Sequence, residues 1–210
     1  IELLDEAQVD AINQYSKTDL AVAPTLLLEF HGTDQGVKEQ AEIVQEIAVD
    51  SGGSNFQWTT NTEERNRLWQ ARHDAAYACK ALRPGGEIWA TDVCVPISRL
   101  AECIRETQQD IRDFGLFAPI VGHVGDGNFH LCLLVGKDDP AESKKANELH
   151  ERMVMRALGM GGTCTGEHGV GYGKLDFLVA EHGEAISVMR SIKQALDPDN
   201  IMNPGKILRV

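Results

Sequence analysis

Two histidines flank a short glycine-rich segment in the middle of the chain. Residues 123–130 read His-Val-Gly-Asp-Gly-Asn-Phe-His, with apolar residues on both sides. An Asp-Gly pair between two apolar runs is typical of a β-hairpin with a type I′ turn. If Asp126 and Gly127 form that turn, His123 faces His130 directly, with Cβ atoms about 4.5–5.5 Å apart. Two imidazoles at this separation can bind one metal ion, although two unrelated histidines beside a tight turn would show the same spacing.

A second glycine-rich segment, residues 161–174, places Glu167 next to His168. A carboxylate can supply a third metal ligand and leave one coordination position open for a substrate. Because adjacent side chains point in different directions, His168 can face that substrate, and imidazole titrates near neutral pH, as a general base requires. From these residues alone, a surface loop with a solvated Glu–His pair is an equally good interpretation. Cys164 and Asp126 are fallback metal ligands.

Composition argues against several classes of protein. The 210-residue chain has 20 Lys and Arg against 32 Asp and Glu, a net charge of −12. Without a basic stripe it is a poor candidate for binding nucleic acid or an anionic membrane. No apolar run is long enough to span a bilayer, and neither a P-loop nor a dinucleotide fingerprint is present. The five cysteines include no C-x-x-C pair, which favours a reducing compartment over a disulfide framework.

The elements that must position these residues alternate between strands and helices. We expect strands at residues 25–30, 55–59 and 87–95, and a hairpin over residues 119–135. The expected helices cover residues 5–17, about 37–51, 61–82, 98–114, 139–159 and 175–196. This order predicts one α+β domain, residues 1–210, with helices packed on one face of a largely antiparallel sheet and with ferredoxin-like strand–helix units.

Several segments together resemble the C-terminal region of the flavin-linked D-2-hydroxy-acid dehydrogenases, which carry a vanillyl-alcohol-oxidase-type flavin domain. The similarity covers essentially the whole chain. The segments that carry it are His123-x-Gly-Asp-Gly-Asn-x-His130, Gly166-Glu-His-Gly169, Trp69-Gln-Ala-Arg-His73 and Asn203-Pro-Gly-Lys206.

Within that family the chain resembles the D-lactate branch, on residues 23–32 and 91–98. Enzymes for 2-hydroxyglutarate have a lysine where this chain has Ala90 and Thr91, and an asparagine where it has Cys132. These departures favour a small monocarboxylate over a dicarboxylate.

The resemblance implies a role for each candidate residue at the catalytic centre. His123, His130 and Glu167 would hold a divalent metal, zinc or manganese, which would polarise the substrate oxygens. His168 would take the hydroxyl proton while hydride leaves the α-carbon for the flavin N5.

Three further residues receive roles in the same way. Arg72 would pair with the substrate carboxylate, which suits a planar guanidinium fork; otherwise it is an exposed helix arginine. Asn203 and Lys206 would lie near the flavin ring; otherwise they belong to an ordinary C-terminal tail.

The function implied is oxidation of a D-2-hydroxy acid, D-lactate to pyruvate, with FAD as hydride acceptor and glycolate or another such acid as the alternative substrate. The electron acceptor would be a cytochrome, a quinone or an electron-transfer flavoprotein. A homodimer is one assembly that the resemblance allows. We expect a cytoplasmic or peripheral membrane location, mitochondrial in a eukaryote.

Because the flavin-binding module precedes this region in the family, we expect the chain to be a fragment that is colourless and inactive alone. Two other classes of function stay open. One is a metal-dependent hydrolase with a His-His-Glu site, and the other is a non-catalytic binding domain.

Overall fold

The computed structural model describes residues 1–209 as a six-stranded sheet with eight helices. The strands are β1 (Glu2–Leu4), β2 (Thr25–Leu27), β3 (Gly86–Ala90), β4 (Val93–Cys94), β5 (Ile120–Gly122) and β6 (Asn128–Gly136). The helices are α1 (Glu6–Ser16), α2 (Asp34–Asp50), α3 (Thr62–His73), α4 (Ala75–Leu82), α5 (Ile97–Phe114), α6 (Pro140–Gly159), α7 (Leu175–His182) and α8 (Ala185–Leu196). The strand order is β2-β1-β5-β6-β3, with β4 also beside β6, and all these pairings are antiparallel.

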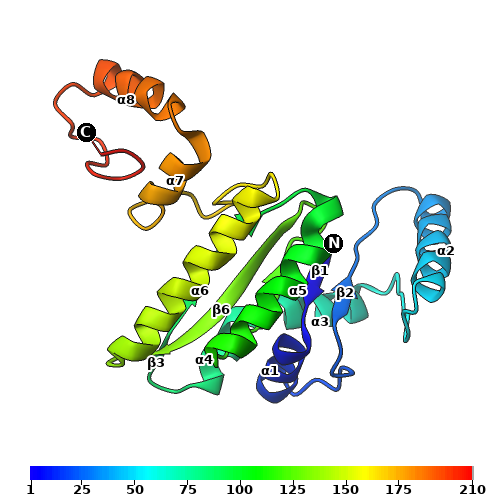
Figure 1. Ribbon diagram of the computed structural model, residues 1–210. Coiled ribbons are helices and arrows are strands. Elements are labelled where there is room, and N and C mark those ends of the chain that lie inside the picture. The colour runs from blue at the N-terminus through cyan, green and yellow to red at the C-terminus, as the bar shows by residue number, and fades with distance from the viewer. Residues whose placement is uncertain (210) are drawn as a thin grey trace.

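Strand β6 is buried on both faces because its apolar side chains alternate between two clusters. Phe129, Leu131 and Leu133 pack with α5 and α6, whereas Cys132 lies in a cluster with α1 and α4. Figure 1 shows α5 and α6 on one side of the sheet, with α1 and α4 beyond it. The α+β class and the antiparallel sheet are therefore confirmed. The second helical layer was not predicted, but it agrees with the continuous apolar run of β6, since a strand covered on both faces lacks polar alternation.

The centre of the sheet contains a ferredoxin-like unit, as predicted. Strands β4 and β5 both run antiparallel to β6, so they are parallel to each other, and α5 connects them. After β6 the chain continues through α6 to Thr163, which forms an antiparallel bridge with Cys94 at the end of β4. The resulting order of strand, helix, two strands, helix and bridge is the split β-α-β arrangement. It brings the segment after α6 back to the edge of β4.

The strand expected at residues 87–95 is interrupted between β3 and β4, and the interruption is centred on Thr91. The Thr91 N–H still donates to the Leu131 carbonyl at 3.1 Å. In the reverse direction, the Leu131 N–H donates to the Thr91 hydroxyl at 2.8 Å instead of to its carbonyl. The freed Thr91 carbonyl lies 2.9 Å from Nδ1 of His130. The Thr91 hydroxyl thus replaces the Thr91 carbonyl as the acceptor for Leu131, and the carbonyl is left to accept from His130.

Two other expected elements differ in the structure. The helix expected at residues 61–82 is divided at Asp74 into α3 and α4. Asp74 accepts hydrogen bonds from Ser16 and Gln70, which connects this bend to α1. The strand expected at residues 55–59 is wrong, because that segment has no regular structure and pairs with no described strand.

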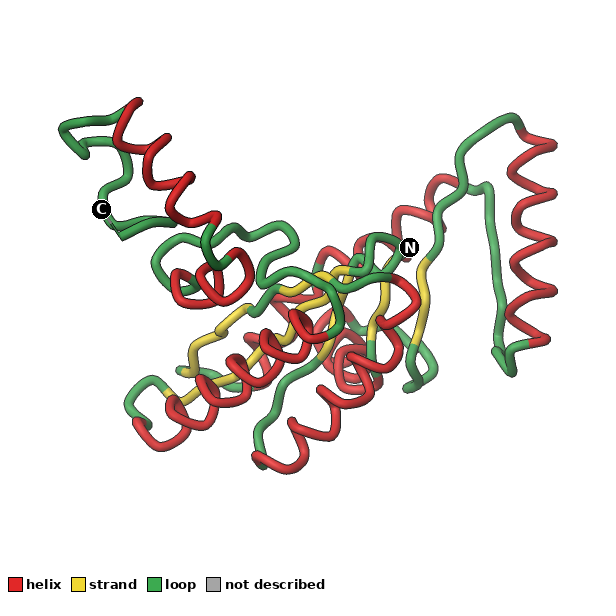
Figure 2. Tube along the Cα trace, turned by 45° about the horizontal axis from the view of Figure 1, so that its top comes forward, coloured by secondary structure: helices red, strands yellow, loops and turns green. Residues whose placement is uncertain are grey.

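Segments at both ends of the chain project from the central body (Figure 2). Helix α2 buries only Ala41. Helices α7 and α8 extend from the opposite end of the molecule. Within residues 1–209, no helix is both long and apolar enough to cross a bilayer.

Candidate active site

The loop between β5 and β6 contains five residues, 123–127, rather than the predicted two-residue turn. The Asp126 N–H donates to the His123 carbonyl at 3.0 Å, and the Gly127 N–H donates to the Val124 carbonyl at 3.3 Å. Gly127 has a φ of +81°, whereas Asp126 is not among the residues with positive φ. The type I′ turn and the direct His123–His130 pairing are therefore wrong. His130 pairs with Val121 instead.

A contact outside the hairpin accounts for this difference. The Gly127 carbonyl accepts a hydrogen bond from the Val95 N–H at 3.0 Å. A Cβ on Gly127 would lie 2.0 Å from the Val95 carbonyl oxygen, so only glycine fits. The loop is thus shaped by the segment that follows β4, which the local sequence of the hairpin does not reveal.

His123 and His130 nevertheless lie on one face, as predicted. His123 is two residues beyond Val121, the partner of His130, so the two histidines are diagonal neighbours across the hairpin. Their ring centroids are 5.8 Å apart, with an angle of 84° between the ring planes.

Glu167 completes a cluster with these histidines. Its Oε1 lies 3.3 Å from Nε2 of His123 and 3.0 Å from Nε2 of His130. The three candidate ligand atoms all lie within 4.8 Å of one another. The structure therefore brings together the three residues that the sequence analysis selected as metal ligands.

The orientation of both rings suits a cation. Nδ1 of His130 faces the Thr91 carbonyl, an acceptor, so it carries the proton and Nε2 presents a lone pair. Burial lowers the pKa of His130, which keeps the ring neutral near neutral pH. Within residues 1–209, its buried Nε2 has no hydrogen-bond partner. Nδ1 of His123 lies 2.7 Å from Oε1 of Glu2, so its Nε2 is also directed at Glu167. Metal-bound histidines show this pattern, with the other ring nitrogen held by a carbonyl or carboxylate.

A second group of potential ligands, Asp92, His130 and His168, shares one histidine with the first. The Asp92 carboxylate is fully buried, and both of its oxygens already accept hydrogen bonds. Burial by itself raises the pKa of Asp92, but hydrogen bonds from Thr165 and other donors, with the charge of Lys174, bring it below the usual range. The His168 ring is stacked on His130 at 4.8 Å between centroids. This second group is the poorer metal site because its carboxylate is saturated by donors.

Arg72 is connected to the cluster through Glu2, a residue for which the sequence predicted no role. Its Nε donates to Oε2 of Glu2 at 2.8 Å, while the other oxygen of Glu2 contacts His123. Glu2 therefore connects the candidate substrate arginine with a candidate metal ligand. Nothing in the sequence distinguished Glu2, because its partners are 70 and 121 residues away.

The remaining candidates lie elsewhere. Asn203 and Lys206 belong to the C-terminal tail, where the Lys206 ammonium lies 5.5 Å from the centre of the Tyr172 ring. Their assignment to the flavin stays a prediction. The fallback ligand Cys164 is fully buried in the apolar cluster, where burial and Glu181 raise the pKa of its thiol to about 12. Among the residues that the structure describes, neither Cys164 nor Asp126 belongs to a group of potential ligands.

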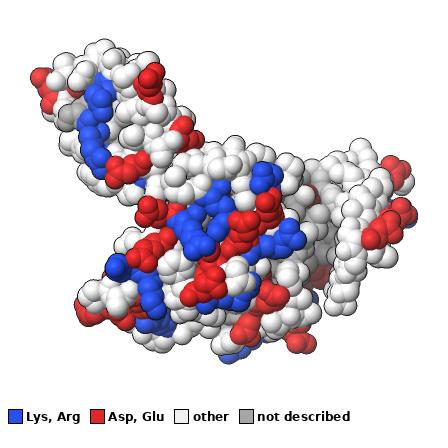
Figure 3. Space-filling view, in the orientation of Figure 1, with Lys and Arg blue, Asp and Glu red and all other residues white. Residues whose placement is uncertain are grey.

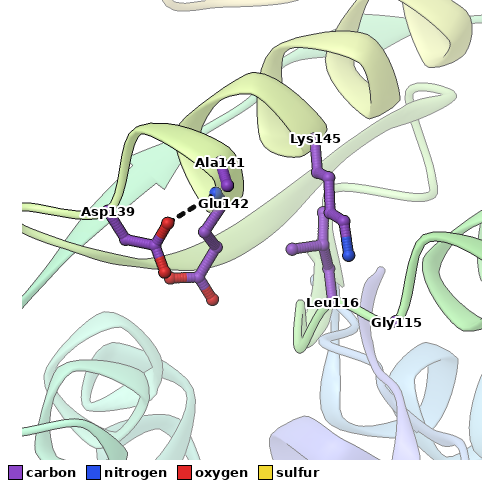
Figure 4. A pocket seen from close by; sticks show the side chains of 6 residues that line it. All are labelled: Gly115, Leu116, Asp139, Ala141, Glu142 and Lys145. Atoms are coloured by element: carbon purple, nitrogen blue, oxygen red, sulfur yellow. Dashed lines mark hydrogen bonds between the residues drawn. The ribbon is translucent and has the colours of Figure 1, made fainter.

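Two surface hollows lie near the opposite end of β6 from the histidines. One, of about 320 Å³, is lined by Leu82, Arg83, Phe117 and Leu134. The other, of about 200 Å³, lies at the start of α6, where the Asp139 carboxylate accepts a hydrogen bond from the Glu142 N–H (Figure 4). Neither hollow is lined by a candidate site residue.

The charged side chains over α5 and α6 alternate in sign on the face seen in Figure 3. Two arginines of α6 pair with acidic residues of α5. Arg156 contacts Glu106, Thr107 and Asp110, and Arg152 contacts Asp110. These ion pairs join one helix to the other.

Comparison with known proteins identifies the family. The model that describes the C-terminal domain of FAD-linked oxidases matches residues 1–207. The chain belongs to this family. This FAD-linked oxidase domain aligns over all of its length with a protein from Danio rerio named probable D-lactate dehydrogenase, mitochondrial. The two are 50% identical, and the alignment covers 42% of that protein. The domain is also 46% identical to the mitochondrial D-lactate dehydrogenase [cytochrome] of Arabidopsis thaliana. That alignment covers 99% of this chain and 37% of the Arabidopsis protein. The chain thus spans about two fifths of the length of these curated relatives.

The fold of the domain is also found among solved structures. The 4-ethylphenol oxidase from Gulosibacter chungangensis superimposes with a TM-score of 0.64 at 19% identity, over 85% of this chain and 38% of that one. This likeness supports the predicted fold of the oxidase domain.

Proposed function

We propose that this domain forms the substrate- and metal-binding part of a flavin-dependent dehydrogenase that oxidises D-lactate to pyruvate. The observation that carries the proposal is the convergence of His123, His130 and Glu167. His168 is stacked on His130, and Arg72 is joined to His123 through Glu2. The identity of about half of the residues to a D-lactate dehydrogenase supports the choice of substrate.

The residues at the cluster fit a divalent cation, zinc or manganese. Two imidazole nitrogens and one carboxylate oxygen are a ligand set that zinc accepts, and they leave a coordination position open. When bound, the cation would supply Lewis-acid polarisation of the substrate oxygens. The open side is accessible, since the Glu167 side chain is 48% exposed and that of His168 is 43% exposed.

The protein's own residues then divide the remaining work. Arg72 donates to Glu2 from Nε, and its two Nη groups are suited to a substrate carboxylate. His168 takes the hydroxyl proton at a ring nitrogen, while the hydride departs from the α-carbon and the carbonyl of pyruvate forms. FAD, held mainly by the part of the protein that lies outside this domain, would supply the hydride acceptor.

Metal content is the first test. We expect the isolated domain to bind Zn²⁺ or Mn²⁺ near one equivalent and His123→Ala to lose that binding. His31→Ala, which changes an exposed histidine between β2 and α2, is the matched control. Equal metal content in His123→Ala and the wild type would remove the ligand assignment.

Substrate and reaction class are tested on the full-length protein with its flavin-binding part. We expect flavin reduction by D-lactate, none by L-lactate, and a large loss of kcat in His168→Gln. Faster reduction by glycolate would move the substrate to that acid. Metal-dependent hydrolysis without flavin reduction would instead support the hydrolase.

The partners and the location follow from the same proposal. We infer that the electrons pass to a cytochrome, as the name of the Arabidopsis relative states for that protein. Both relatives are named mitochondrial, so a mitochondrial location is the corresponding prediction in a eukaryote. A homodimer stays a prediction that sedimentation would test.

A further inference from the structure

We propose that Asp92 is the positioning residue that holds Glu167 and His168 in place for the chemistry of the site. This inference rests on the proposed function, because it concerns the same metal and substrate site. It assigns a role to a residue that is neither a ligand nor in contact with substrate.

The first argument is the set of donors that surround the Asp92 carboxylate. Oδ2 accepts hydrogen bonds from three consecutive backbone N–H groups, at 2.8 Å from Gly166, 3.1 Å from Glu167 and 3.0 Å from His168. The Thr165 hydroxyl donates to the same oxygen at 2.7 Å. One buried carboxylate therefore fixes the backbone on which the third ligand and the proton acceptor are carried.

The second argument is that the same residue reaches the other components of the site. The Lys174 ammonium donates to the Asp92 carbonyl at 2.8 Å and lies 3.4 Å from Oδ2, at the start of α7. On the sheet side, Oδ1 accepts from Asn128 at 2.7 Å and lies 3.7 Å from Nδ1 of His130. Asp92 thus connects the histidine hairpin, the glycine-rich segment and the helix that follows it.

The third argument is how closely the segment lies over the carboxylate. A Cβ on Gly166 would lie 1.9 Å from the Asn128 amide nitrogen and 3.0 Å from Oδ1 of Asp92. The segment is also joined to β4 before it reaches Asp92, through the bridge between Cys94 and Thr163. Backbone attached at both points has little freedom, so Glu167 is held ready before any ligand arrives.

The test uses Asp92→Asn in the isolated domain. The amide has about the same volume as the carboxylate. In either orientation, however, its NH₂ group faces N–H or O–H donors that hydrogen-bond to a carboxylate oxygen in the wild type. We expect the Kd for Zn²⁺ or Mn²⁺ to rise by about 10–100-fold, as is typical when a partner of a metal ligand is removed. In the metal-free protein, the amides of residues 166–168 should exchange with solvent at least about tenfold faster.

Asp110→Asn is the matched control. Asp110 is also a buried carboxylate with basic partners, Arg152 and Arg156, but it lies between α5 and α6. Its amide variant should lower the melting temperature without changing the metal Kd or the exchange of residues 166–168. If Asp92→Asn does not fold, Thr165→Val removes one of the same hydrogen bonds and should raise the Kd severalfold.

Two outcomes would overturn the inference. One is unchanged exchange of residues 166–168 in folded Asp92→Asn, or in Thr165→Val if that variant has to replace it. The other is an equal effect of Asp110→Asn on the metal Kd. Absence of metal binding in the wild type would count against the proposed metal site, whereas amide exchange would still test Asp92. The two failures are therefore distinguishable.

Discussion

Glu2 is the residue whose replacement most directly tests the geometry around His123. Its carboxylate joins Nδ1 of His123 at 2.7 Å to Nε of Arg72 at 2.8 Å. In Glu2→Gln only one of these two donors keeps an acceptor, because the amide has a single oxygen. We expect both metal binding and recognition of the substrate carboxylate to weaken.

The size of the effect follows from burial. The side chains of Glu2 and Arg72 are only 12% and 17% exposed, so water replaces the lost contact poorly. A hydrogen bond to a charged group contributes about 1.5–3 kcal/mol, and we expect the free energy of unfolding to fall by roughly this amount. The Kd for Zn²⁺ should rise by about 10–100-fold, which corresponds to about 1.4–2.8 kcal/mol.

Calorimetric titration with Zn²⁺ measures the first effect, and the KM for D-lactate in the full-length protein measures the second. Glu142→Gln is the control, since Glu142 forms a similar pair with Arg83 at 2.7 Å near the start of α6. It should lower stability and leave the Kd unchanged. A Kd for Glu2→Gln within twofold of the wild-type value would refute the orienting role of Glu2.

Three further changes test other parts of the structure. Gly166→Ala introduces a Cβ that would lie 1.9 Å from the Asn128 amide, so the segment must shift and the Kd for Zn²⁺ should rise more than tenfold by titration. Burial lowers the pKa of His150 to about 4. The unfolded chain therefore binds more protons between pH 6.5 and 4, and stability should fall across that window by up to about 3 kcal/mol; in His150→Phe, melting temperatures should lose this part of the pH dependence. Met153→Ala removes a fully buried side chain from the α6 side of the core and should cost about 2–5 kcal/mol in urea denaturation.

The fold was predictable where one segment carried its own pattern. The apolar residues of β6 and the cap at Asp139, whose carboxylate accepts from the Glu142 N–H, are local features. The break at Thr91 was not predictable, because it depends on an exchange of acceptors with His130 and Leu131, 39 and 40 residues away. Hydrogen bonds of this kind leave no periodic pattern in the sequence.

The candidate site shows the same division. That His123 and His130 share a face followed from the alternation of side chains along a hairpin. The exact register did not, since the contact between Gly127 and Val95 decides it. From the residues alone, Glu167 was equally well interpreted as a metal ligand or as a solvated loop side chain. The sequence does not show that a buried carboxylate holds the backbone of residues 166–168.

The charges around the cluster are the reason for which we expect a divalent cation there. Of three nearby carboxylates, Glu2 is offset by Arg72, and Asp92 by Lys174. Among the described residues, the groups within 4 Å of the Glu167 carboxylate that can carry a positive charge are histidines. The Nε2 of His130 presents a lone pair, because Nδ1 faces the Thr91 carbonyl, and a lone pair repels a carboxylate unless a cation lies between them. A divalent ion bound by Glu167 would change the uncompensated charge of the cluster from −1 to about +1. A positive charge suits a substrate that is a monocarboxylate anion.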